Sequence, residues 1–132
     1  MLLAKLQRLA AWNQGRREAA ARYDQLLAQA ALPGVVAPRT LEGNEPIFHL
    51  YVVRVPRRDE VLKKLNADGI GAGIHYPVPC HLQGAFKHLG LGPGAFPVSE
   101  KAAGEIISLP MYGELTADQQ ARVVDSLRKA LA

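Results

Sequence analysis

The chain has 132 residues, the length of a single domain. Hydrophobic residues make up 48% and charged residues 21% of the sequence, and this ordinary balance excludes intrinsic disorder. The formal net charge is +4 at pH 7, but lysines and arginines are spread along the chain without a basic run, which disfavours a nucleic-acid-binding protein.

The first thirty or so residues predict one long helix. Residues 2–31 are rich in Ala, Leu, Arg, Gln and Glu and contain no proline. Apolar residues recur near helical spacing, namely Leu6, Leu9, Ala20, Tyr23, Leu27 and Ala31. Such a helix would be roughly 45 Å long, which is long for a domain of this size. We expect a bend near Asn13 and Gly15, where polar residues interrupt the stripe, and an end at residues 32–34, Leu-Pro-Gly.

Three segments predict strands. Residues 47–55 are rich in β-branched and aromatic residues and are apolar on both faces, so we expect a covered, central strand. Residues 70–76 form a glycine-rich strand, and residues 107–109 a third short strand closed by Pro110. Together they predict a three-stranded sheet.

Helices alternate with these strands. They are expected at residues 57–68, 83–90 (one or two turns only), 98–106 and after Thr116. Gly69 is a natural stop for the first, Ser99 is a candidate N-cap for the third, and Thr116 with Gln119 has capping-box spacing. The order indicates an α+β fold, with a long N-terminal helix followed by a small three-stranded sheet covered on one side by helices.

The glycines at 69, 71 and 73 precede an unusual turn, His75-Tyr76-Pro77. Alternate glycines suggest a dinucleotide-binding loop, but that motif needs a strand before it and a helix after it. Here the order is helix, glycines and strand, so we favour a helix cap followed by a strand whose face something approaches closely. The proline turn then lifts two polar rings from that strand, which indicates the rim of a ligand site.

Other candidate sites are weaker. The four histidines, at 49, 75, 81 and 88, lack the spacing and the acidic neighbours of a metal site. The only cysteine is Cys80, so an internal disulfide and a cysteine-based zinc site are excluded, and we expect an incidental rather than catalytic thiol. Glu100 and Glu105 are expected to be solvated. No segment has the length of a membrane span, and the N-terminus, broken by Lys5 and Arg8, lacks a signal peptide's apolar core, so we expect a cytoplasmic protein.

Two interpretations stay open at this point. His75 and Tyr76 could contact a ligand or could be satisfied by the local backbone. Arg54, Arg57 and Arg58 could form a patch for an anionic partner, although a strand end and a solvated first helical turn is the favoured explanation.

Several separated motifs resemble the DegT/DnrJ-type family of sugar aminotransferases. They are His49-Leu50-Tyr51-Val52-Val53-Arg54, Gly69-Ile70 with Gly73-Ile74-His75-Tyr76-Pro77-Val78-Pro79, His81-Leu82-Gln83, Phe96-Pro97-Val98-Ser99-Glu100, Ser108-Leu109-Pro110-Met111 and Leu115-Thr116. They follow the family's order over essentially the whole chain. The resemblance implies that residues 1–31 are the helix joining a large domain to a small one, and that residues 32–132 are the C-terminal small α+β domain.

The resemblance also implies a function. Members use pyridoxal phosphate to move an amino group, usually from glutamate, onto a keto sugar attached to a nucleotide, and residues 82–83 look most like members acting on 3-keto deoxysugars. It gives His75, Tyr76 and His81 a role in binding the nucleotide-sugar substrate. It assigns no catalytic or cofactor-binding residue, because the family's large domain carries them and would precede Met1. None of Lys63, Lys64, Lys87, Lys101 and Lys129 is a Schiff-base candidate.

We therefore expect the C-terminal part of a transaminase that is inactive alone, binds no pyridoxal phosphate by itself and forms a homo-oligomer. The alternative is a non-catalytic interaction module with a basic surface.

Overall fold

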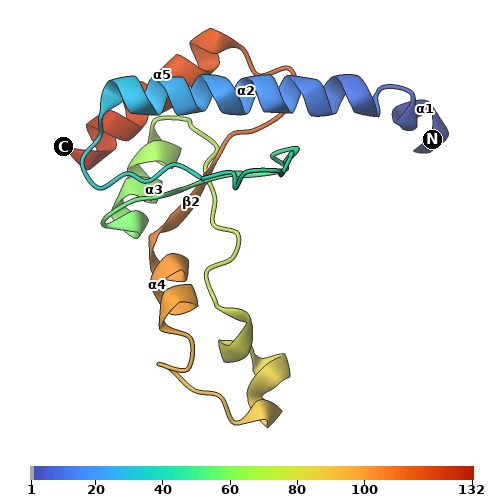
Figure 1. Ribbon diagram of the computed structural model, residues 1–132. Helices are drawn as coiled ribbons and strands as arrows, with labels where there is room; N and C mark the ends of the chain where they lie inside the picture. Colours follow the sequence, from blue (N-terminus) through green and yellow to red (C-terminus); the bar gives the residue numbers. More distant parts are fainter. Residues whose placement is uncertain (1) are drawn as a thin grey trace.

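The computed structural model describes residues 2–132, and Figure 1 shows how their helices and strands are arranged. The elements in chain order are α1 (Leu2–Leu6), α2 (Leu9–Ala30), β1 (Tyr51–Arg54), α3 (Arg58–Ala67), the short 3-10 helices η1 (Cys80–Leu82) and η2 (Gly84–Leu89), α4 (Pro97–Glu105), β2 (Ile106–Leu109) and α5 (Ala117–Leu131).

The N-terminal helix breaks in a different place from the one predicted. The break lies between α1 and α2, at residues 7–8, and the helix runs on through Asn13 and Gly15. A Cβ on Gly15 would lie 2.5 Å from the carbonyl oxygen of Gly113, so this glycine permits another segment to cross the helix closely rather than bending it. The predicted end is confirmed, with Ala31 as the left-handed C-cap.

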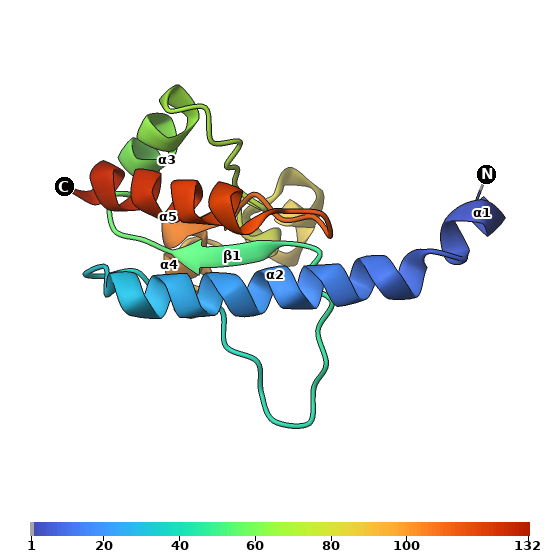
Figure 2. The same ribbon diagram turned by 90° about the horizontal axis from the view of Figure 1, so that it is seen from above.

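The core lies between α2, α5, α3 and the two strands. Helices α2 and α5 lie side by side, as Figures 1 and 2 show. Buried apolar side chains from every one of these elements meet there, among them Tyr23, Leu27, Val53, Leu65, Ile107 and Leu127. The fully buried Gln120 of α5 donates to the carbonyl of Ala19 at 2.7 Å and accepts from Arg22 at 2.7 Å. These bonds fix the pairing of the two helices because a buried amide must be satisfied.

The predicted three-stranded sheet is wrong. Strands β1 and β2 pair antiparallel, and the expected third strand at residues 70–76 is reduced to one bridge between Gly73 and Ser108. On one side of that bridge the N–H of Ala72 is already bonded to Ile70 and Asn66 in a local turn. On the other side Pro77 lacks a donor, so the ladder cannot continue.

The first strand is also shorter than predicted. Residues 47–50 were expected to be extended, but Phe48 has φ of 49°, a left-handed conformation that interrupts a strand. The pairing of β1 is therefore confined to Tyr51–Arg54 in register with Ile106–Leu109.

A second body, which we call the lobe, comprises residues 76–105 and projects away from the core (Figure 1). It contains η1, η2 and α4. The predicted N-cap at Ser99 is wrong, because α4 starts with Pro97 and Phe96 occupies the cap position. The capping box at the start of α5 is confirmed, with Thr116 and Gln119 each bonding the other's backbone N–H.

One arginine of α2 binds both the segment that precedes β1 and the segment that follows β2. The Nη1 atom of Arg16 donates to the carbonyls of Phe48 and His49 at 3.1 Å each and of Met111 at 3.2 Å. The first two carbonyls precede β1 and the third follows β2. A single guanidinium thus fixes both strand ends against the long helix.

We expect Arg16→Ala to lower the free energy of unfolding by about 2 kcal/mol, because three carbonyls lose a charged donor. Urea denaturation at pH 7 measures this. The control is Arg17→Ala, whose exposed partners Gln14 and Glu45 should make the change smaller than about 0.5 kcal/mol. Equal losses in the two variants would contradict the role given to Arg16.

Candidate functional site

The site predicted from the glycine-rich segment begins where the chain leaves the sheet. Gly73 and Ser108 exchange two backbone hydrogen bonds, at 3.1 and 2.8 Å. The Nδ1 atom of His75 then lies 2.9 Å from the hydroxyl oxygen of Ser108. The ring of Tyr76 meets the His75 ring edge-on, with centroids 5.6 Å apart, and Tyr76 is 72% exposed. The two rings therefore stand at the surface on an anchored base.

His81 occupies a different environment. Its Nε2 atom lies 3.0 Å from the carboxylate of Glu100, and its ring meets Phe96 edge-on at 4.8 Å between centroids. The His81 side chain is only 7% exposed. It is thus inside the lobe, joining η1 to the start of α4.

Glu100 is the hub of the lobe. Besides contacting His81, its carboxylate accepts from the backbone N–H of Gly94 at 2.9 Å and of Phe96 at 3.1 Å. Those backbone bonds, Gly94 first, outweigh partial desolvation and, with His81, hold the pKa of Glu100 below its usual value. The expectation of a solvated Glu100 is wrong, because the carboxylate supplies the cap that the N-terminus of α4 lacks.

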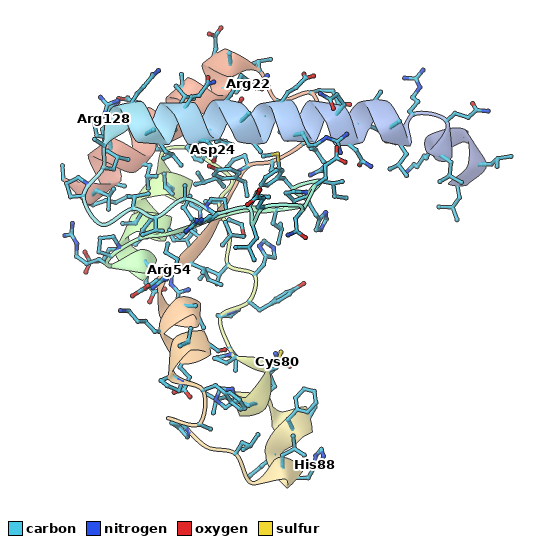
Figure 3. The ribbon with its side chains drawn as sticks, in the orientation of Figure 1. Arg22, Asp24, Arg54, Cys80, His88 and Arg128 are labelled. Carbon is cyan, nitrogen blue, oxygen red and sulfur yellow. The ribbon has the colours of Figure 1, made fainter. Side chains whose placement is uncertain are left out.

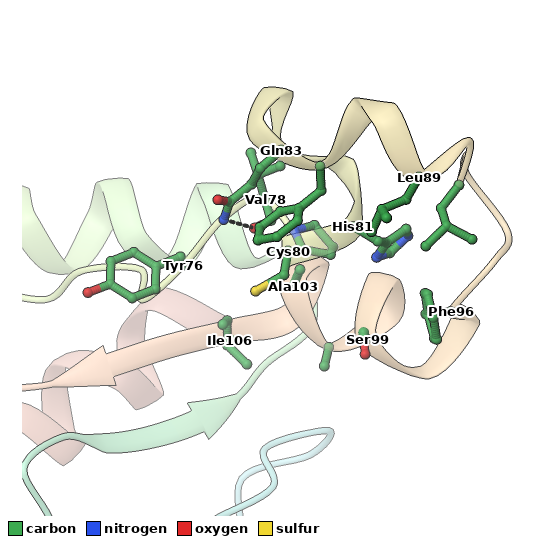
Figure 4. A pocket seen from close by; sticks show the side chains of 14 residues that line it. Tyr76, Val78, Cys80, His81, Gln83, Leu89, Phe96, Ser99, Ala103 and Ile106 are labelled. Carbon is green, nitrogen blue, oxygen red and sulfur yellow. Dashed lines mark hydrogen bonds between the residues drawn. The ribbon is translucent and has the colours of Figure 1, made fainter.

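The lobe encloses an open cavity of about 640 Å³. Figure 4 shows Tyr76 at one end, Cys80, Ala103 and Ile106 in the middle and Phe96 at the other end. Its walls are apolar and aromatic and include no acidic side chain, lysine or arginine; the lining side chains come from Tyr76, Val78, Pro79, Cys80, His81, Gln83, Phe86, Leu89, Leu91, Phe96, Ser99, Ala102, Ala103 and Ile106. Such a cavity suits a largely flat, apolar moiety.

The three predicted site residues are thus divided. Tyr76 and His81 line the same cavity, whereas His75 is not among its lining residues and is tied to β2 through Ser108. Sequence reasoning missed the aromatic wall made by Phe86 and Phe96. A usable signal for the Glu100 hub was present, since a glutamate four residues after the N-cap position Phe96, which lacks a capping side chain, can reach back to free N–H groups.

The arginine cluster has internal partners. Arg54 pairs with Glu105, and Arg58 donates to the carbonyl of Ala103 at 2.9 Å. Arg57 donates to the carbonyl of Leu131 at 2.8 Å, beside the bond from Lys64 to Ala130 at 3.1 Å. Arg57, Arg58 and Lys64 satisfy carbonyls at the ends of α4 and α5, and Arg54 pairs with a carboxylate, which supports the structural explanation over an anionic-partner patch.

Residues 2–132 contain few side chains that are placed to bind a metal ion or a cofactor. No group of three or more His, Cys, Asp or Glu side chains there could hold a metal ion. Figure 3 places Cys80 and His88 at different points of the lobe. Within the same residues, none of the helices combines the length and apolar character needed to cross a bilayer.

Pyridoxal phosphate does not fit the cavity of the lobe. The cofactor needs a lysine for its aldehyde, a carboxylate for its ring nitrogen and donors for its phosphate. The cavity of the lobe has no lysine or carboxylate in its lining. Two of the lysines are engaged elsewhere, Lys64 with the carbonyl of Ala130 and Lys129 with Asp125.

Comparison with known proteins identifies the fold and lineage. The profile of the DegT/DnrJ/EryC1/StrS aminotransferase family matches residues 1–128. A dTDP-3-amino-3,4,6-trideoxy-alpha-D-glucose transaminase of Micromonospora megalomicea subsp. nigra is 46% identical over 99% of this chain and 36% of its own length. A pleiotropic regulatory protein of Geobacillus stearothermophilus is 42% identical over 96% of this chain and 34% of its own.

A solved structure supports the similarity found for these two relatives. The S. venezuelae DesV protein in complex with a ketimine intermediate superposes with a TM-score of 0.91 and 38% identity, covering 98% of this chain and 34% of that one. The chain therefore spans about a third of the length of the relatives it matches.

The lowered pKa of Glu100 gives a pH-dependent prediction. A carboxylate with a lowered pKa stabilises the fold at neutral pH and loses that contribution as pH falls through its folded-state pKa. We expect Glu100→Gln to lower the melting temperature at pH 7, and the difference from wild type to shrink once pH is below the ordinary value of 4.5. Differential scanning calorimetry from pH 7 to pH 3 measures it.

The matched control for this series is Glu42→Gln, a glutamate that is exposed in the loop before β1. It should leave the melting temperature nearly unchanged at every pH. A Glu100→Gln deficit that stayed constant down to pH 3 would show that the carboxylate's charge is not what stabilises the lobe.

Proposed function

This chain belongs to the DegT/DnrJ/EryC1/StrS aminotransferase family, and from that premise we propose that it is the C-terminal part of a nucleotide-sugar transaminase. The whole enzyme would transfer an amino group, with glutamate as donor, to the keto carbon of a sugar linked to a nucleotide. Such a reaction serves the synthesis of deoxyamino sugars or polysaccharides in the cytoplasm.

The observation that carries the proposal is agreement along the entire chain with a relative of that activity. The Micromonospora transaminase is 46% identical over 99% of the chain, so the turn at His75 and Tyr76 and the lobe both fall inside the matched region. A fold shared at a TM-score of 0.91 with DesV supports the same assignment.

The geometry suggests which residues meet the substrate. We assign Tyr76 and His81 to the cavity of the lobe, where Tyr76 offers a largely exposed ring and His81 contributes a wall. Aromatic side chains bind flat bases by stacking, and Phe86 and Phe96 line the same cavity. His75 stands beside the cavity, where it can reach a polar part of the same ligand.

The cofactor belongs elsewhere in this proposal. Because the cavity of the lobe does not fit pyridoxal phosphate, we place the cofactor on the two-thirds of the relatives' length that this chain does not match, and we infer that the chain alone is inactive. The interaction-module alternative receives no support from Arg54, Arg57 and Arg58, since each is engaged within the fold.

Titration of the purified chain with dTDP tests the nucleotide site. We expect saturable binding in calorimetry, and Tyr76→Ala should weaken it about fivefold or more, the loss expected for one stacked ring. Tyr112→Ala is the matched control, because Tyr112 is also an exposed tyrosine, at 39%, but does not line the cavity. Equal effects of the two changes would contradict the assignment.

The same preparation tests the inactivity of the chain. Addition of one equivalent of pyridoxal phosphate should give no saturable lysine-linked absorbance band and no amino transfer from glutamate. A stoichiometric band lost on replacing a single lysine by arginine would overturn the view that this chain lacks the cofactor site.

The short N-terminal helix α1 supports association with a second copy. Leu2, Leu3 and Leu6 are 80%, 76% and 59% exposed, so α1 presents an apolar face. We expect sedimentation at micromolar concentration to show a dimer, and the double change Leu3→Lys with Leu6→Lys to give a monomer. Val98→Lys, which alters an 83% exposed residue of the lobe, is the control. A monomeric wild type would refute the association.

A further inference from the structure

Ser108 is a buried hydroxyl with one partner. It lies in β2, is 4% exposed, and its backbone N–H and C=O are both taken by Gly73. Among residues 2–132, its hydroxyl oxygen lies within hydrogen-bond distance of a single group, the Nδ1 atom of His75 at 2.9 Å. A buried O–H without an acceptor costs free energy, and the Nδ1 atom of His75 is the one acceptor that this hydroxyl contacts, so donation from Ser108 to His75 is the favoured direction.

That restriction favours one placement of the ring hydrogen of His75. Neutral imidazole has one N–H donor and one acceptor nitrogen. If the Ser108 hydroxyl donates to Nδ1, then Nδ1 is the acceptor and the hydrogen resides on Nε2. The exposed His75 ring makes no other side-chain hydrogen bond in the described chain, so its Nε2–H is free to donate outward.

Gly73 keeps the ring in this position. A Cβ on Gly73 would lie 3.3 Å from Cε1 of His75 and 4.0 Å from Nδ1, so the imidazole packs against a backbone position that has no side chain. A Cβ on Gly71, by contrast, would meet nothing within 4 Å. Of the alternate glycines, Gly73 is therefore the one that lies against the ring, where an added Cβ would push the imidazole away by a few tenths of an ångström.

We propose that Ser108 and Gly73 are positioning residues that hold His75 as the Nε2–H tautomer, so that it donates a hydrogen bond to a phosphate oxygen of the nucleotide sugar. The ligand part of this inference rests on the proposed function; the tautomer part does not. The geometry leaves His75 as a fixed donor beside an apolar cavity, an arrangement that separates recognition of the diphosphate from recognition of the base.

Nitrogen-15 NMR of the imidazole rings tests the tautomer in the ligand-free chain above pH 8. His75→Gln identifies the His75 signals by their loss. In the wild type we expect Nδ1 to have the shift of an unprotonated nitrogen and Nε2 that of a protonated one. In Ser108→Ala the difference between the two shifts should shrink as the other tautomer gains population, and Ser108→Thr should restore it.

The control is Ser126→Ala, which removes another buried serine hydroxyl, one that contacts Asp68. It should destabilise the fold without changing the nitrogen-15 shifts of His75. The control therefore distinguishes a general loss of stability from a loss of the contact that positions His75. A proton on Nδ1 in the wild type, or a Ser108→Ala spectrum like that of the wild type, would overturn the inference. The wild-type measurement stands even if a variant fails to fold.

Titrations with dTDP and with thymidine then test the phosphate contact separately from the tautomer. Adding dTDP should shift the His75 Nε2–H signal, whereas thymidine, which has no phosphate, should not, and Ser108→Ala should bind dTDP about three- to tenfold more weakly. A shift with thymidine alone would overturn the phosphate contact. If His75 is the Nε2–H tautomer but its shifts do not change on adding dTDP, the nucleotide site of the proposed function is contradicted, whereas the role of Ser108 is supported.

Discussion

The positive charge of Arg16 is the point on which the arrangement of the core depends. Three carbonyls that flank the strands converge on one nitrogen of this side chain, so the helix, the entry to β1 and the exit from β2 cannot move independently. These carbonyls lie outside the ladder of the two-stranded sheet, so Arg16 supplies the donor that the ladder does not. The register of β2 in turn places Ser108 beside Gly73, and hence fixes where the His75 ring can stand.

The lobe is held by a different kind of force. Burial of apolar side chains stabilises the core, whereas a single carboxylate, that of Glu100, gathers His81 and two backbone N–H groups in the lobe. The aromatic residues Phe86 and Phe96 that line the cavity stay partly exposed, at 40% and 49%.

Local signals predicted much of the fold. The capping box at Thr116 and the helix stop at Gly69 depend on neighbours in sequence, and both are present. The prediction of a third strand was wrong because the turn before Gly73 and the proline after Tyr76 limit its pairing to one bridge. The amino-acid composition of a segment does not reveal such limits. The His81–Glu100 contact joins residues that are 19 positions apart, so no local pattern predicts it. His81 became a candidate site residue only through the family resemblance.

The close crossing of Gly15 and Gly113 has a consequence for how such chains diverge. Either glycine, given a Cβ, would strike the opposite backbone, at 2.5 Å from the Gly113 oxygen or at 3.2 Å from that of Trp12. No flexible side chain stands between them to absorb a change. The two positions should therefore behave as a coupled pair during evolution, in which a larger residue at one site survives only where the helix and the crossing segment have moved apart together.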